Sequence, residues 1–273
     1  MTANSHTPRI MPDRQTNPDM TNVYHIAYAP GIKKAYLFHW NCNLKCRGCL
    51  CKKEINCLAL EENLDVVARD PHLAPPRGPE SFLSLNGIME TLRKVELKEV
   101  LFEGQEATID PHFEEICRRL KSEFGVYITL NTNGLKLPDL ANVDEVVFSL
   151  KAVTPELYLD YTEVPNTKML KNFETIFRSG KKLRAEMVFI PGYIDMAETE
   201  AIARHIARLS PNIPLRIDAY FECGDNTWRR ATPEEMSQAV ALAKKHLNTV
   251  TCTQQTTDNL DKKDLFFEVK RLF

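Results

Sequence analysis

A cluster of cysteines constrains this chain more than any other feature. Of the eight cysteines, four fall within the ten residues between Cys42 and Cys51. The first twenty residues are polar, carry three prolines and lack the apolar core of a secretory signal. No apolar run is long enough to span a bilayer. We therefore expect a cytoplasmic protein with reduced cysteines, in which such a cluster indicates a metal site and not a disulfide framework.

The cysteine spacing favours an iron–sulfur cluster over zinc. Structural zinc generally takes two separated pairs of Cys or His residues, and no second pair follows here. Three thiolates spaced four and then three residues apart suit a [4Fe–4S] cubane with one iron left without a protein ligand. We predict Cys42, Cys46 and Cys49 as the metal ligands. A zinc site and a set of free thiols are the alternatives.

Strand-like and helix-like segments alternate along most of the chain. The helical segments carry cap signals at Ser84, Asp110-Pro111, Gly180 and Thr232. The apolar runs of strand length are residues 34–40, 99–103, 126–131, 145–150, 184–190 and 215–220. This alternation predicts a parallel α/β fold, and six units predict a partial (β/α)6 TIM-like barrel.

Composition excludes several classes of protein. With 43% hydrophobic and 26% charged residues, the chain is neither disordered nor fibrous. A net charge of -2 gives no general attraction to nucleic acid or membrane, and we expect neither as a partner. We predict a flexible polar segment at 1–22, the barrel at 23–248, and an extension at 249–273 that docks on the barrel. Residues 71–80 are proline-rich and are predicted to form a loop or a lid.

A family resemblance rests on five motifs in order. Cys42-x3-Cys46-x2-Cys49 resembles the signature of the radical S-adenosylmethionine (SAM) superfamily. The other four segments resemble, in turn, the Gly-Gly-Glu-Pro, Asp-Thr-Asn-Gly, Asp-Leu-Lys and Val-Pro-Gly-x-x-Asp motifs of pyruvate formate-lyase (glycyl radical enzyme) activating enzymes: residues 103–111, 131–134, 148–151 and 187–195. The resemblance covers residues 35–220, and each motif follows or ends a predicted strand, where barrel enzymes place their active sites.

The resemblance implies an oxidoreductase-like radical SAM enzyme of the activating type, with a [4Fe–4S] cluster and S-adenosylmethionine as cofactors. Such enzymes cleave S-adenosylmethionine reductively to a 5′-deoxyadenosyl radical that abstracts hydrogen from a substrate. The alternative is a non-enzymatic iron–sulfur or zinc protein that carries electrons or serves as a scaffold. The cofactor-binding residues that the resemblance implies are Gly48, Leu50, Gly104, Gln105, Glu106, Asn133, Ser149, Lys151 and Glu186.

Some positions depart from the family pattern. Gly48 stands where many relatives place an aromatic residue against the adenine, so Leu50 or Trp40 is expected to supply that contact, with a plain core role as the alternative for Trp40. Glu186 stands where activating enzymes carry an arginine, and either pairs with Arg184 on the same strand face or contacts the cofactor. The remaining departures are Gln105 for glycine, Ala107 for proline, Asn131 and Ser149 for aspartates, and Phe221 for histidine.

The resemblance also implies partners. Four basic residues near the cysteine cluster are expected either to dock an acidic flavodoxin or ferredoxin as electron donor or to be solvated: Lys45, Arg47, Lys52 and Lys53. The substrate is a protein, a peptide or a small molecule. Cys117 is expected to be a buried thiol, and the other cysteines show no ferredoxin-like spacing for a second cluster.

Overall fold

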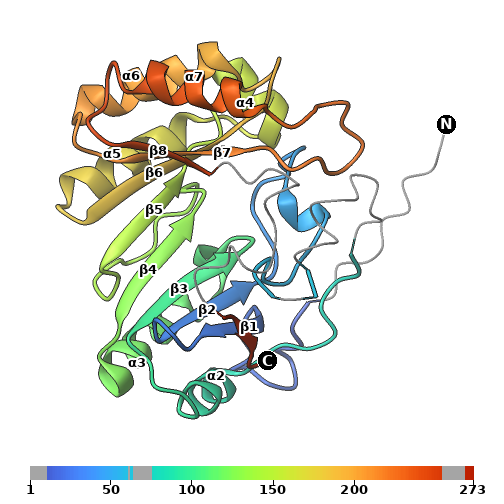
Figure 1. The fold of residues 1–273 in the computed structure, drawn as a ribbon. Coiled ribbons are helices and arrows are strands. Elements are labelled where there is room, and N and C mark those ends of the chain that lie inside the picture. The colour runs from blue at the N-terminus through green and yellow to red at the C-terminus, as the bar shows by residue number, and fades with distance from the viewer. Residues whose placement is uncertain (1–10, 61, 64–75, 254–267) are drawn as a thin grey trace.

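The computed structural model describes residues 11–60, 62–63, 76–253 and 268–273. Its strands form one sheet with the order β8-β7-β6-β5-β4-β3-β2-β1-β9. Seven strands run parallel, from β2 to β8. These are β2 (Lys34–His39), β3 (Glu99–Gly104), β4 (Tyr127–Thr132), β5 (Glu145–Ser149), β6 (Lys182–Phe189), β7 (Leu215–Ala219) and β8 (Val250–Thr253). The sheet curves without closing (Figure 1), which confirms the partial barrel.

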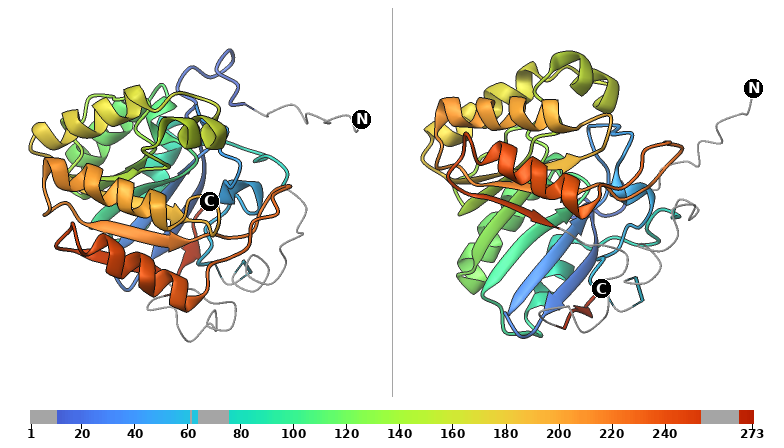
Figure 2. Two further views of the ribbon diagram at one scale, coloured as in Figure 1. Left: turned by 90° about the horizontal axis from the view of Figure 1, so that it is seen from above. Right: turned by 45° about the horizontal axis from the view of Figure 1, so that its top comes forward.

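Helices cover the outer, convex side of this sheet (Figure 2). They are α2 (Leu85–Leu92), α3 (Phe113–Phe124), α4 (Pro155–Thr162), α5 (Thr167–Arg178), α6 (Met196–Leu209) and α7 (Pro233–Ala243), with two short 3-10 helices, η1 (Leu50–Lys52) and η2 (Ala107–Ile109). The main core lies between helices and sheet, where Phe102, Phe113 and Phe148 are fully buried. Among the helices described, none is long and apolar enough to cross a bilayer.

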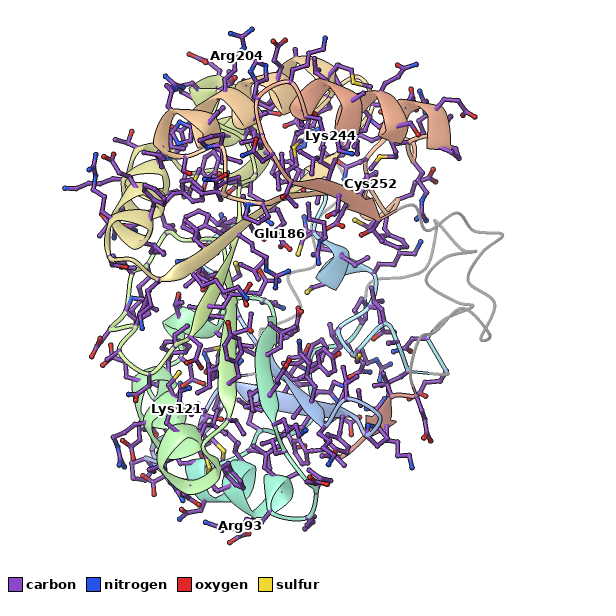
Figure 3. The ribbon with its side chains drawn as sticks, turned by 60° about the vertical axis from the view of Figure 1, so that its left-hand side comes forward. Arg93, Lys121, Glu186, Arg204, Lys244 and Cys252 are labelled. Atoms are coloured by element: carbon purple, nitrogen blue, oxygen red, sulfur yellow. The ribbon has the colours of Figure 1, made fainter. Side chains whose placement is uncertain are left out.

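Alternation along the strands separates the core from the inner face of the barrel. In β2 and β6, buried side chains alternate with partly exposed ones. Successive side chains of a strand point to opposite faces, so one set packs under the helices and the other faces the concave interior. Figure 3 places Glu186 on this concave side, whereas Arg204 of α6 and Arg93 after α2 lie on the outside. The inner face therefore carries charged side chains such as Glu103 and Glu186.

Most predicted helix ends are confirmed. Ser84 accepts a hydrogen bond from the Gly87 amide at the start of α2, and Thr232 forms a complete capping box with Glu235 at the start of α7. The prediction that Asp110 caps the next helix is wrong, because α3 begins at Phe113 with His112 before it.

Asp110 is occupied elsewhere. One carboxylate oxygen accepts the backbone N–H of Asn22 at 2.6 Å, and the other accepts that of His112 at 2.9 Å. The same side chain lies 3.7 Å from the ring of the buried His39. It therefore ties the start of the first strand to the β3–α3 connection instead of capping the helix.

Two antiparallel strands were not predicted. β1 (Val23–Ala29) pairs with β2, and β9 (Lys270–Arg271) pairs with β1. The C-terminal Phe273 carbonyl accepts the Ile26 N–H at 3.0 Å, so residues 268–273 lie along the sheet edge. Before β1, the Thr21 N–H donates to the Leu83 carbonyl at 3.0 Å. Phe266, Phe267 and residues 71–75 of the predicted lid lie outside the described residues.

Candidate active site

The three predicted metal ligands lie in the loop between β2 and η1, and all three line one large cavity on the concave side of the sheet. The cavity has a volume of about 760 Å³, which is in the range of small-molecule sites. Burial raises the pKa of Cys42 to about 12 and that of Cys46 to about 11, whereas a hydrogen bond from Cys51 lowers that of Cys49. The loop thus directs three thiols into one space.

The cysteine loop already carries N–H donors to sulfur. The Leu44 amide lies 3.4 Å from Cys42 Sγ, and Asn133 Nδ2 lies 3.5 Å from the same atom. Within the described part of the chain, no three His, Cys, Asp or Glu side chains converge closely enough to hold a single metal ion. Three thiols on one loop, spread around a cavity and met by N–H donors, fit the ligand set of an iron–sulfur cluster with a free corner.

Contacts from distant segments hold the cysteine loop in place. The Arg47 N–H donates to the Tyr161 carbonyl of α4 at 3.0 Å, and the Arg47 carbonyl accepts from Asn226 Nδ2 at 2.9 Å. Cys223 Sγ donates to the Cys49 carbonyl at 3.3 Å. The loop is therefore tied both to α4 and to the connection that follows β7.

An aromatic cluster packs against Gly48. A Cβ atom at position 48 would lie 2.9 Å from Tyr220 Cε2, 3.0 Å from Tyr161 Oη and 3.4 Å from Trp228 Cζ3. This explains why glycine replaces an aromatic residue here: rings from α4 and the post-β7 segment already fill the space. Leu50 lines the cavity.

Trp40 is half-buried and lies beside β1. It packs edge-on against Tyr24, with ring centroids 5.8 Å apart, and is not among the residues that line the cavity. The expectation that it supplies an apolar contact in the site is wrong, because its ring turns toward the β1 side of the sheet.

The segment after β3 makes a close backbone approach. Gly104 has φ +88°, and a Cβ there would lie 2.7 Å from both the backbone nitrogen and the carbonyl oxygen of His39. The Gln105 N–H donates to the His39 carbonyl at 2.9 Å. Both Gly104 and Gln105 line the cavity beside the cysteine loop.

Glu106 is the one predicted site residue that does not line the cavity. It is fully buried, and its carboxylate accepts from Thr108 Oγ1 at 2.6 Å, Thr132 Oγ1 at 2.8 Å and the Asn133 N–H at 2.8 Å. All of these donors belong to the protein. Glu106 therefore joins the segment after β3 to the end of β4, and the predicted direct contact with a cofactor does not match this placement.

The ends of β4, β5 and β6 bring the other predicted residues together. Asn133, Ser149, Lys151 and Glu186 all line the cavity. Ser149 Oγ donates to the Glu186 carboxylate, which also accepts from Arg216 Nη2 at 2.6 Å. The expected pair of Glu186 with Arg184 is wrong.

Arg184 pairs with Glu145 on the neighbouring strand instead. Glu145 also forms an ion pair with Lys182, at 2.9 Å. This one carboxylate, near the start of its strand, therefore pairs with both Arg184 and Lys182. In the middle of the inner face, Arg216 bridges Glu186 and Asp218, with 3.0 Å from its Nε to Asp218 Oδ2.

Lys151 is the cation that lowers the pKa of Cys46 and Cys49 most. Burial alone would lower its pKa, but the Cys46 sulfur and the Glu186 carboxylate outweigh burial and raise it. Its ammonium group makes no hydrogen bond or ion pair among the described residues. It can therefore receive a negatively charged group of a bound molecule.

Sequence reasoning missed several cavity residues, namely Glu103, Asp218, Tyr220 and Arg230. The signal for Glu103 was available, because it directly precedes Gly104 and shares the inward face of β3. Burial, together with the like charge of Glu186, raises the pKa of Glu103 to about 7. Arg230 lies in an irregular connection whose path the sequence does not reveal.

The predicted docking patch is largely paired within the chain. Lys45 contacts Glu163 at 2.8 Å and Arg47 contacts Asp160 at 2.7 Å. Lys53 is only 3% exposed and donates to the Glu222 carbonyl. These bases therefore stabilise the cysteine loop, and electrostatic docking of an acidic electron carrier has less free charge available than the sequence suggested.

The remaining five cysteines lie in three places. Cys51 and Cys57 line the cavity, whereas Cys117 is buried under α3 as predicted. Cys223 and Cys252 follow or lie on β7 and β8.

Comparison with known proteins comes from sequence and from structure. The family model described as "Radical SAM superfamily" matches residues 37–206. A Methanocaldococcus jannaschii protein described as "Putative glycyl-radical enzyme activating enzyme" is 27% identical over 246 residues, which cover 86% of this chain and 85% of that protein. The benzylsuccinate synthase activating enzyme of Thauera aromatica is 30% identical over 128 residues, covering 41% of this chain and 39% of that enzyme.

Among solved structures, SuiB from Streptococcus suis matches with a TM-score of 0.56 at 14% identity. The match covers 81% of this chain and 48% of SuiB, so this chain spans about half of that protein. At this identity the likeness concerns the fold.

Proposed function

This chain belongs to the radical SAM superfamily and is an enzyme of that type, and we propose that it cleaves S-adenosylmethionine reductively at a [4Fe–4S] cluster held by Cys42, Cys46 and Cys49. The observation that carries the proposal is that these three thiols line one cavity of about 760 Å³. The M. jannaschii relative supports an activating-enzyme-like role, in which hydrogen is abstracted from a protein substrate.

The residues around the thiols fit a sulfonium amino acid. When bound, the cluster and S-adenosylmethionine supply the radical chemistry of the superfamily. Lys151 offers an unpaired ammonium for the carboxylate of the methionine moiety, and Gly104, which has no side chain, brings backbone to the cavity wall beside Gln105. Asn133, Ser149 and Glu186 add polar groups on the same wall. The role of this chain is to hold and orient both groups in the cavity.

Glu106 supports the site from behind. By accepting hydrogen bonds from Thr132 and the Asn133 N–H, it keeps the end of β4 against the segment after β3. We assign it a positioning role in place of a direct contact. An electron donor of the flavodoxin or ferredoxin kind remains part of the proposal.

The proposal is tested with anaerobically reconstituted protein reduced by dithionite. We expect brown protein that converts S-adenosylmethionine into 5′-deoxyadenosine and methionine, measured by liquid chromatography. Cys46→Ala should abolish both the visible absorbance of the cluster and the cleavage. Cys117→Ala, which removes a buried thiol under α3 far from the loop, is the matched control and should retain both. Full cleavage by Cys46→Ala would refute the ligand assignment.

The substrate is addressed in a second experiment. Candidate glycyl radical proteins deuterated at glycine are incubated with the enzyme, and deuterium is sought in the released 5′-deoxyadenosine by mass spectrometry. Transfer from a protein identifies an activating enzyme. Transfer only from small metabolites would contradict the activating role while leaving the radical SAM chemistry intact.

A further inference from the structure

Arg230 presents an unpaired cation to the cavity. It lies in the connection between β7 and α7 and lines the cavity wall. Its guanidinium carbon sits 4.4 Å from the centroid of the Phe221 ring. Its Nη2 atom is buried and has no hydrogen-bond partner, and no acidic side chain in the described ranges forms an ion pair with it. A buried guanidinium donor without an acceptor costs desolvation free energy, and a bound ligand that accepts its hydrogen bond would recover that cost.

Neighbouring arginines show that this state is unusual in the chain. Arg229, the preceding residue, is paired with Glu235 at 2.6 Å, and Arg216 is paired with Glu186 at 2.6 Å. The acid nearest to Arg230 is Glu222, and its carboxylate accepts the backbone N–H of Arg230 at 3.1 Å and not the guanidinium. The connection therefore fixes the backbone of Arg230 and leaves its guanidinium N–H groups available to a bound molecule.

Stacking determines what that ligand can be. With one face against Phe221, the guanidinium plane is held and its N–H edge stays available. A planar guanidinium edge matches the two oxygens of a carboxylate or phosphate, which it binds with two parallel hydrogen bonds. Burial lowers the pKa of Arg230, since desolvation disfavours the charge, and an oxyanion would relieve that cost.

Four basic side chains line the cavity, namely Lys45, Lys52, Lys151 and Arg230. Lys45 is paired with Glu163 and Lys52 donates to the Arg47 carbonyl, which leaves Lys151 and Arg230 without an ion pair or side-chain hydrogen bond among the described residues.

Lys151 follows β5, the strand next to β4, and Asn133 directly after β4 reaches Cys42 Sγ at 3.5 Å, so Lys151 is on the cysteine side of the cavity. Arg230 lies in the connection between β7 and α7, two strands along the sheet from β5. A carboxylate of S-adenosylmethionine bound near the metal ligands would therefore meet Lys151, and the second cation remains for another molecule.

We propose that Arg230, held flat by Phe221, binds a carboxylate or phosphate group of the substrate in the cavity. This inference rests on the proposed function, because it takes the cysteine side of the cavity as the cofactor side. It assigns the substrate to the anionic class: a peptide with an acidic side chain, or a metabolite that carries a carboxylate or phosphate.

The test uses reconstituted protein with saturating S-adenosylmethionine and inorganic phosphate or acetate as the probe, measured by isothermal titration calorimetry at low ionic strength. We expect wild type to bind the probe, Arg230→Gln to bind it about tenfold more weakly or not at all, and Arg230→Lys to fall between them. Arg229→Gln is the matched control, since it removes an adjacent surface arginine already paired with Glu235, and should bind like wild type. Circular dichroism melting confirms that each variant is folded.

Two outcomes would overturn the proposal. Equal probe binding by wild type and Arg230→Gln would show that the oxyanion is bound elsewhere. Loss of probe binding on adding S-adenosylmethionine, with weaker cofactor affinity in Arg230→Gln, would show that Arg230 serves the cofactor carboxylate. Failure of wild type to cleave S-adenosylmethionine under dithionite would instead refute the proposed function. A parallel titration of phosphate or acetate without S-adenosylmethionine would then still test whether Arg230 binds an anion.

Discussion

Glu103 offers a quantitative test of how the cavity is charged. The side chain comes from the inward face of β3 and lines the cavity. The other acids of the inner face are paired: Glu99 with Lys34, Glu145 with Arg184, and both Glu186 and Asp218 with Arg216. Glu103 has no ion-pair partner among the residues that the structure describes.

The cost of ionising Glu103 follows from its pKa. Burial raises that pKa from the ordinary 4.5 to about 7, and Glu186 adds to the effect. The folded protein therefore keeps a proton that the unfolded chain has lost, so stability falls as pH rises from about 4.5 to about 7. A gap of roughly 2.5 pH units at ~1.4 kcal/mol each corresponds to ~3 kcal/mol. Because the carboxyl is partly open to the cavity, water screening reduces the observed effect to ~1–3 kcal/mol.

Glu103→Gln removes this cost without changing the size of the side chain. We expect the variant to unfold with nearly the wild-type free energy at pH 5 and to be ~1–3 kcal/mol more stable than wild type at pH 8. The measurement is anaerobic urea unfolding at both pH values, followed by circular dichroism. Contributions from other groups, such as the buried His25 with its pKa lowered to about 4 by desolvation, cancel between the two proteins.

Glu99→Gln is the control for this experiment. Glu99 lies on the same face of the same strand but is paired with Lys34 at 3.4 Å. It should show no gain in stability between pH 5 and pH 8. A constant stability difference between wild type and Glu103→Gln across this range would refute the view that Glu103 is an uncompensated acid in the cavity.

Three further predictions concern the framework of the site. Gly104→Ala places a Cβ against the His39 backbone at positive φ and should cost about 1–3 kcal/mol in urea unfolding, while Gly125→Ala, with open space around it, should be milder. In Glu106→Gln the side-chain NH2 replaces one carboxylate oxygen and faces Thr132 Oγ1 or the Asn133 N–H, which are themselves donors. This variant should lower the unfolding free energy by about 2–3 kcal/mol in the same assay. Trp228→Ala removes the ring over Arg47, 4.8 Å away, and iron release from reconstituted protein to a chelator should become several-fold faster; an unchanged rate would count against the role of these contacts in holding the loop.

The parallel strands could be predicted from sequence because each is a short apolar run between caps and turns. Every predicted run overlaps an observed strand, from β2 to β7. β1 was missed because all seven of its residues are buried, including His25, so no alternation of polar and apolar residues marks it. β9 spans two residues, too few for any periodic pattern.

The candidate site was predictable where a side chain acts from a strand end. Asn133 directly follows β4 and Ser149 ends β5, so both line the cavity because parallel strands deliver their last residues to one edge of the sheet. Glu186 lines it from within β6, on the inward side of that strand. Glu106 and Arg184 were misjudged for a different reason: each has partners on a neighbouring strand or loop, and those partners depend on register. Arg230 depends on the course of an irregular connection, and only the folded chain shows that it stacks on Phe221.

The bonds of the cysteine loop to the connection after β7 have a consequence for the width of the opening. β2 and β7 are separated by four strands in the sheet, and no strand pairing joins them directly. The hydrogen bonds from Asn226 and Cys223 to the loop that follows β2 therefore connect the two sides of the barrel opening, which the sheet itself leaves unjoined. Binding or loss of a metal group at the cysteine loop, which would reshape this loop, would then alter the distance between the loop after β2 and the connection after β7. That distance sets the size of molecule that can enter the cavity.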